Sequence, residues 1–320
     1  GLGDVYKRQP QDSVHTAIDR KDPYVKRCVG IPGDVIEFRA GRLFVNNAPE
    51  KILGDEQQQH GYLVTTSSQL NIPQLYKAYG FLPVQENQTN TGFVYAFQGL
   101  TDQTAKEIKA LPEIVEMKEI IEEKGEGAVR FKLNADKTAY TKNVDTTQSI
   151  YPINKPWNQD WYGPLRIPKK GDVVTLNQET LPTYKWIISE YEHNKLENKN
   201  GKIYVNGQET NQYTIKQNYY MMIGDNRDAS LDARFFGVVP EENIVGRPMF
   251  TWLSVEGLFS DAGSTYQAPG KKIRWDRMFK ATNTGEANKT SYWWVAVIIL
   301  VLFFGWDYFA KLFKKKNEED

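Results

Sequence analysis

The stretch YVKRCVGIPGD, residues 24–34, decides how the rest of the chain is interpreted. A short apolar run that contains a lysine ends in a turn of glycine and proline, which predicts a β-strand entering a tight turn. Side chains alternate along a strand, so Tyr24, Lys26 and Cys28 would share one face, with the Lys26 amine among apolar neighbours. Burial lowers the pKa of a lysine, and a neutral amine can accept a proton from a hydroxyl group. Lys26 is therefore a candidate general base; the alternative is an edge-strand lysine that extends its amine into water.

Composition limits the size of the core and the class of partner. With 320 residues, 40% of them hydrophobic, the chain can bury a core and has room for about two domains. Its 40 basic residues balance 40 acidic ones, and without a basic excess we expect no nucleic-acid partner. The three histidines are scattered and Cys28 is the only cysteine. We therefore expect no metal site and no internal disulfide, and no motif predicts a cofactor.

The first nine residues differ from the rest of the chain. Residues 1–9 are basic and lack apolar periodicity, and DVYKRQ at positions 4–9 resembles the translation of a transposon-end tag used to prepare DNA libraries. We interpret residues 1–9 as a sequencing or adapter artefact and exclude them from the fold. The natural chain is expected to begin upstream of residue 10.

Two similar ribbons lie far apart in the sequence. Alternation over residues 35–47 predicts a hairpin, and GKIYVNG at 201–207 resembles its return strand, GRLFVNN at 41–47. The pattern favours one β-rich core, formed by residues 10–50 and 166–280 and interrupted by an insertion. Chance similarity between two hairpins is the alternative.

The insertion, residues 51–165, is more polar than the core and carries no catalytic motif. Alternating segments predict strands, and a helix is expected between Thr101 and Leu111, capped by Thr101 or Asp102 and stopped by Pro112. We expect a small α+β module that covers or extends a groove, or else a passive spacer.

A second informative run is MIGDNRDASLDAR at 222–234. An apolar strand leads into a loop in which aspartates and arginines alternate around a serine. A solvated turn held by surface ion pairs is one interpretation. A calcium loop is disfavoured, because the acidic residues do not occupy the required alternate positions.

Taken together, these two runs resemble bacterial signal peptidase I, a membrane-bound Ser/Lys endopeptidase. FFGVVP at 235–240, IVGR at 244–247 and IRWDR at 273–277 extend the resemblance, which covers about residues 16–50 and 165–280. It implies a mainly β fold: a signal-peptidase-like β core with a large α+β insertion and a C-terminal transmembrane helix. The insertion and this anchor are most similar to forms from Bacteroidetes. The implied activity is the removal of signal peptides from secretory preproteins.

The resemblance also assigns roles to residues. It implies that Lys26 is the general base and that Ser230 orients its amine. Two ion pairs would hold the loop against the strand, namely Arg27 with Asp225 and Asp232 with Arg234. Ala229 stands where the family usually has asparagine. No chemical task follows for Asn226 or Asp228.

The nucleophile is the main departure from the family pattern. In the family it is a serine upstream of the lysine, in a Ser-Met-x-Pro segment that this sequence does not contain. Ser13 is the only serine before Lys26, and because Val14 and His15 follow it, the role is not transferred to it. We expect an N-terminally truncated chain that holds no nucleophile and is inactive as printed.

The C-terminal region predicts a membrane anchor. Residues 292–310 are apolar with tryptophans near both ends, and about 19 helical residues rise roughly 28 Å, enough to cross a bilayer. Lysines follow on one side only, in the tail 311–320. Under the positive-inside rule, this tail would be cytoplasmic and the catalytic part would face the periplasm from the inner membrane, in contact with lipid. Residues 281–291 would be a linker; a buried core helix is the alternative.

Two other classes of protein remain open. A LexA-like self-cleaving protein would share the Ser/Lys core, but it should carry a DNA-binding helix pair and no anchor. An anchored, non-catalytic β-rich binding module would lack the serine segment altogether.

Overall fold

The computed structural model describes most of the chain. The described residues are 24–51, 58–81, 83–125, 129–133, 140–144, 150–256, 272–275, 278, 280–281, 294–295, 297–298 and 301. The chain divides into two compact units: Gly1–Lys51 with Gln57–Val245, and Ile52–Glu56 with Gly246–Asp320. The proposed adapter segment 1–9 and Ser13 lie outside the described residues. The predicted domain boundaries stay a prediction.

The strand from residues 24–34 is shorter than the apolar run and lies at one end of its sheet. This antiparallel sheet has the order β1-β17-β18, formed by β1 (Arg27–Gly30), β17 (Tyr219–Ile223) and β18 (Val239–Pro240). Arg27 pairs with Ile223 and Cys28 with Met222, whereas Gly30 pairs with Met221, so Val29 is an extra residue in β1. Such a bulge bends a strand locally. Lys26 directly precedes β1 and therefore lies beside the loop that follows β17.

A second sheet carries the first ribbon. Its order is β11-β2-β3-β4, with β11 (Tyr162–Arg166), β2 (Val35–Arg39), β3 (Arg42–Val45) and β4 (Ala48–Pro49). Ile36, Phe38 and Leu43 are buried while the residues between them are more exposed, as expected of a sheet with one face in the core. These three residues belong to a core that also includes Tyr219, Met221 and Ile223 of β17 and so joins the two sheets.

The second ribbon repeats the first. It consists of β13 (Leu196–Lys199), β14 (Lys202–Val205) and β15 (Gln208–Glu209). The Asn206 side chain accepts a hydrogen bond from the Lys195 amide at 2.9 Å, just as Asn46 accepts from the Val35 amide at 2.9 Å. Both asparagines have φ of 52°. The similarity seen in the sequence therefore extends to the backbone of the turns.

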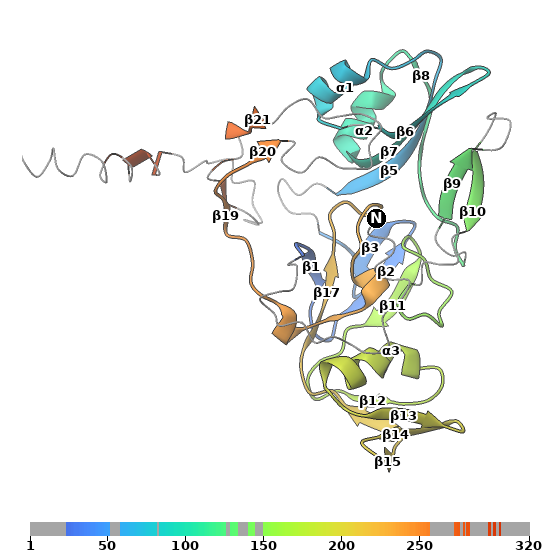
Figure 1. The fold of residues 1–320 in the computed structure, drawn as a ribbon, viewed down its shortest axis with the longest axis vertical. Helices are drawn as coiled ribbons and strands as arrows, with labels where there is room; N and C mark the ends of the chain where they lie inside the picture. Colours follow the sequence, from blue (N-terminus) through green and yellow to red (C-terminus); the bar gives the residue numbers. More distant parts are fainter. Residues whose placement is uncertain are drawn as a thin grey trace, which may run out of the picture. The chain divides into compact units, whose positions relative to one another are not determined.

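The remaining elements of the first unit surround these sheets (Figure 1). One helix, α3 (Leu181–Trp186), continues as a single π-helical turn over Ile187–Tyr191. The other short elements are β12 (Val173–Thr175), β16 (Gln212–Thr214), α4 (Ala233–Phe236) and a 3-10 turn at Glu241–Asn243.

The insertion folds as an α+β module. Its antiparallel sheet has the order β6-β7-β5-β8 and is flanked by two helices, with α2 against β7 and β8 (Figure 1). These elements are β5 (Gln59–Thr66), α1 (Ile72–Tyr79), β6 (Pro83–Thr89), β7 (Gly92–Thr101), α2 (Asp102–Lys109) and β8 (Ile114–Glu119), followed by a hairpin of β9 (Val129–Leu133) and β10 (Tyr140–Val144). Thr101 caps α2, because its hydroxyl accepts a hydrogen bond from the Thr104 amide.

The second unit contains two short described ribbons and corrects one prediction. β19 (Phe250–Thr251) pairs with β22 (Lys280–Ala281), and β20 (Val255–Glu256) with β21 (Lys272–Ile273). Among the residues that the structure describes, no helix is long and apolar enough to cross a membrane. The transmembrane helix predicted over 292–310, and the orientation deduced from it, are therefore not supported. An apolar run indicates burial, but it does not by itself produce one long continuous helix. Of this range only positions 294, 295, 297, 298 and 301 lie within the described residues.

Candidate active site

Strand pairing brings Lys26 to the loop that follows β17. Because Arg27 is opposite Ile223, the preceding Lys26 lies beside Gly224, where the loop begins. The Lys26 Nζ donates a hydrogen bond to Ser230 Oγ at 2.8 Å, across 204 residues of sequence. The structure thus joins the two residues predicted to be base and orienting hydroxyl. Their roles stay a prediction.

The surroundings of Lys26 favour its neutral form. Burial lowers the pKa of the Lys26 amine, the Asp232 carboxylate opposes that shift, and the Arg234 guanidinium adds to it. Burial acts in this direction because it removes water from the ammonium. The amine is thus shifted toward the range in which it can accept a proton from a hydroxyl group.

Gly224 permits the close approach of serine and lysine. A Cβ atom at this position would lie 2.1 Å from Ser230 Oγ and 3.5 Å from Lys26 Nζ. The first distance is far below van der Waals contact, so any side chain here would displace Ser230. Sequence reasoning did not single out this glycine; the signal was its place between the end of a strand and the serine loop.

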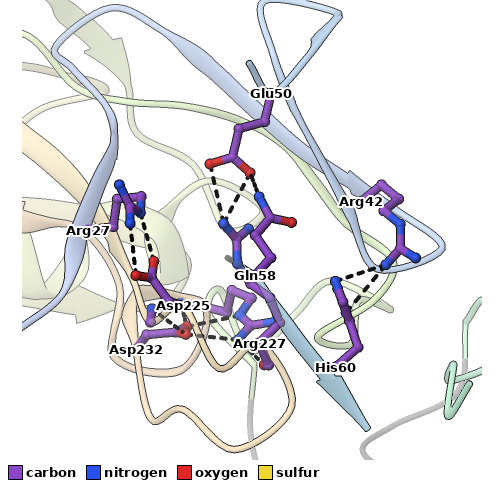
Figure 2. Close-up of polar contacts among 10 residues, drawn as sticks. Arg27, Arg42, Glu50, Gln58, His60, Asp225, Arg227 and Asp232 are labelled. Carbon is purple, nitrogen blue, oxygen red and sulfur yellow. Dashed lines mark hydrogen bonds and ion pairs between the residues drawn. The ribbon is translucent and has the colours of Figure 1, made fainter. Parts of the chain in front are cut away.

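Arg27 fastens the loop to β1, the strand that directly follows Lys26. Its Nε and Nη2 donate to the two carboxylate oxygens of Asp225 at 2.7 and 2.8 Å, the bidentate geometry that arginine forms with carboxylates (Figure 2). The pair is partly exposed, so it positions the loop while adding little to the free energy of unfolding.

The second predicted pair is fully buried. Arg234 donates from Nε and Nη2 to the Asp232 carboxylate at 2.9 and 2.8 Å, and both residues are at most 1% exposed. Asp232 also accepts from the Gly224 amide, while Arg234 donates to the carbonyl oxygens of Arg227 and Gln159. A buried pair that is hydrogen-bonded on all sides fixes the positions of the segments it joins. Here it fixes both ends of the serine loop.

A third ion pair had not been predicted. Arg227, 1% exposed, donates from Nη2 to the two oxygens of Glu50 at 3.2 and 3.0 Å. Gln58 donates to the same carboxylate, so Glu50 lies between Gln58 and Arg227 (Figure 2). Glu50 follows the first ribbon, and no local pattern in the sequence marks it as a partner of a loop 177 residues away.

The described residues offer no centre for a metal ion. No group of three or more His, Cys, Asp or Glu side chains among them is arranged as a ligand set.

These features define a class of site: in a β-rich fold, a lysine with a lowered pKa is hydrogen-bonded to a serine hydroxyl. A family model described as signal peptidase, peptidase S26, matches residues 5–110 and 137–253, which is more than half of the chain. The chain belongs to this family.

Individual relatives agree with this family. Signal peptidase I of Haemophilus influenzae is 34% identical over 111 residues, which cover 34% of this chain and 28% of that protein. Signal peptidase I of Helicobacter pylori strain 26695 is 44% identical over 69 residues, covering 21% and 24%. In these matches the chain spans about a quarter of the length of the curated relatives. No solved structure matches the chain.

Proposed function

We propose that this chain forms the catalytic part of a serine endopeptidase of the signal peptidase I type, with Lys26 as the general base. The observation that carries the proposal is the 2.8 Å contact from Lys26 Nζ to Ser230 Oγ, at an amine whose pKa is lowered by burial. The substrates would be secretory preproteins, and the product a mature protein released from its signal peptide.

In the proposed mechanism, Lys26 transfers protons in both halves of an acyl transfer. The neutral amine takes the hydroxyl proton of a nucleophilic serine, which lies outside the described residues, as the serine oxygen bonds to the scissile carbonyl carbon. The ammonium then gives this proton to the departing amide nitrogen as the C–N bond breaks. In the second half, Lys26 takes a proton from water as the water oxygen attacks the ester carbonyl carbon. The ammonium then gives that proton to the serine oxygen as the ester C–O bond breaks, which restores the neutral amine.

The surrounding residues would keep the amine neutral and correctly aimed. Ser230 restricts the Lys26 amine to one direction, as a third group does in a catalytic triad. Burial is the main cause that disfavours the ammonium; the Asp232 carboxylate opposes it, and Arg234, which pairs with Asp232, offsets part of that opposition. One buried ion pair would thus both influence the pKa of the Lys26 amine and hold the loop in place.

The substrate would bind as an added strand. β1 lies at the end of its described sheet, with Tyr24 and Val25 strongly exposed beside it. An extended peptide can hydrogen-bond to such an edge while shallow pockets select its side chains. We propose that small side chains precede the cleaved bond and that cleavage takes place at the outer face of the inner membrane. Exposed Met249, Trp252 and Trp275 of the second unit support contact with membrane lipid.

Cleavage of a preprotein by the protein expressed from its complete reading frame tests the proposal. Replacing Lys26 by Met should abolish turnover while preserving the length and apolar character of the side chain. Lys170→Met is the matched control, because Lys170 is exposed and its amide bonds to Asn218, at the opposite end of β17 from the serine loop. Turnover that survives in Lys26→Met would remove Lys26 as the base, and a chain that cleaves nothing would favour the binding-module alternative.

A further inference from the structure

The first strand of the insertion is hydrogen-bonded to the loop that carries Ser230. The Gln59 amide donates to the Asp225 carbonyl at 2.9 Å, and the Arg227 amide donates to the Gln59 carbonyl at 2.9 Å. Gln59 thereby forms a parallel bridge with Asn226. The loop is thus held by β1 through Arg27 on one side and by β5 through its backbone on the other.

A side chain of the loop continues this contact. The Asp228 carboxylate accepts a hydrogen bond from the Gly61 amide, two residues farther along β5. A Cβ atom at Gly61 would lie 3.2 Å from the Asp228 oxygen, so the carboxylate is seated directly against the strand. Asp228 is only two residues from Ser230. A shift of the carboxylate would therefore be transmitted to the hydroxyl that contacts Lys26.

The inserted module is itself fixed to the core ribbon. Arg42 of β3 donates two hydrogen bonds to Glu119 at the end of β8, at 2.8 and 3.0 Å. The same guanidinium lies 3.1 Å from His60 Nε2, and His60 is only 3% exposed (Figure 2). Gln58 adds a hydrogen bond to Glu50. Because β5 is held to the ribbon through these contacts, it can act as a fixed support for the serine loop.

We infer that β5 is a brace for the catalytic loop and that Asp228 and Gly61 are positioning residues for the Lys26–Ser230 pair. The insertion is then a part of the catalytic machinery rather than a spacer. The inference rests on the proposed role of Lys26 as the base. It assigns a role to the side-chain oxygen at position 228, which accepts a hydrogen bond from the Gly61 amide of β5.

We expect the pKa of the Lys26 amine to change in variants that leave the side chains of Lys26 and Ser230 unmodified. Asp228→Ala removes the acceptor of the Gly61 amide, which should release the loop, admit water to the amine and raise the pKa of Lys26 by about half a unit or more. Asp228→Asn keeps an oxygen acceptor while losing the charge and should stay close to the unmodified protein. Gly61→Ala pushes the carboxylate away and should shift the pKa in the same direction as Asp228→Ala, by less.

Trace labelling of Lys26 with a small amine-acylating reagent, followed by mass spectrometry across a pH series, measures this pKa without requiring turnover. Glu116→Ala is the control, since Glu116 is exposed in the same module and its ion pair is with Lys118. A shift in Asp228→Ala and Gly61→Ala that is absent in Asp228→Asn and Glu116→Ala supports the brace. An unchanged pKa in both Asp228→Ala and Gly61→Ala overturns it, as does an equal shift in Asp228→Asn, which would indicate a charge effect.

Preprotein cleavage by the same variants expressed from the complete reading frame, assayed in parallel, separates this inference from the proposed function. If labelling gives the predicted pattern but no variant or unmodified protein cleaves a preprotein, the brace stands and the peptidase assignment fails. If Asp228→Ala does not fold, as judged by circular dichroism, Gly61→Ala decides alone, because it leaves every side chain of the loop in place and adds a single methyl group to β5.

Discussion

The two ribbons of the core have the same backbone geometry, but they differ in what the residue at the end of each ribbon contacts. Each forms a tight hairpin and then a short third strand, and each closes with the same amide bond, from Glu50 to the Leu43 carbonyl at 2.8 Å and from Thr210 to the Ile203 carbonyl at 2.9 Å. In the first ribbon, Glu50 holds the buried Arg227 of the serine loop. In the second, Thr210 bonds only locally, to Gln212. A repeated scaffold can thus be joined to an active site by one side chain at its end.

The largest expected effect tests this difference between the two ribbons. Glu50→Ala leaves the guanidinium of Arg227 buried without the carboxylate that pairs with it, which should lower the free energy of unfolding by about 3 to 5 kcal/mol. Thr210→Ala removes one surface hydroxyl and should cost less than about 1 kcal/mol. Urea denaturation of both variants checks the difference. Equal losses would show that the Glu50 pair has no special weight in the fold.

A pH effect should arise where Asp160 contacts the turn of the first ribbon. The Gly41 amide of its turn donates to the Asp160 carbonyl, and burial raises the pKa of the Asp160 carboxyl to about 7, with Asp228 and Glu122 acting in the same direction. Between pH 4 and 7, given a pKa of about 4 for an unfolded aspartate, the folded state binds more protons than the unfolded state. The free energy of unfolding should therefore fall as pH rises, by roughly 2 to 4 kcal/mol.

Asp160→Asn should flatten that dependence, because an amide does not titrate, while the Glu122 amide keeps an oxygen acceptor there. Thermal melts from pH 4 to 8 provide the measurement. A slope in the variant as steep as in the unmodified protein would assign the effect to another group.

The smallest effect should be common to both ribbons. Asn46→Ala and Asn206→Ala each remove a side-chain acceptor from a backbone amide and place alanine at φ of 52°, a left-handed conformation that asparagine tolerates better. Each should cost about 1 to 2 kcal/mol. Similar losses in denaturation would sharpen the comparison by showing that the turns are equivalent; a large loss for only one of them would mean that the repeat is superficial.

Local patterns and the family resemblance predicted more than composition did. Alternation predicted both ribbons, and the resemblance placed Lys26 with Ser230 and Arg27 with Asp225, which the structure brings into contact. The contacts of β5 with the loop could not be predicted this way. They are backbone bonds and a single carboxylate contact between distant segments, and neither leaves a periodic signal.

The transmembrane prediction was wrong because it depended mainly on hydrophobicity. Its signal was strong in composition, yet a run of apolar residues specifies only that the residues avoid water. The length of a helix depends in addition on how each residue's backbone is satisfied by its neighbours. The second unit therefore could not be deduced from hydrophobicity, whereas the first unit, with turns marked by glycine and asparagine, could be outlined.

The extra residue in β1 has a consequence for how the protein can change. Val29 offsets the pairing of β1 with β17 by one position, between Cys28 and Gly30. Deleting Val29 would make the pairing continuous, because Cys28 and Gly30 already pair with the adjacent residues Met222 and Met221. Lys26 would keep its place beside Ser230, and β1 would lose its local bend. The extra residue therefore sets the curvature of the strand and leaves the position of the lysine unchanged.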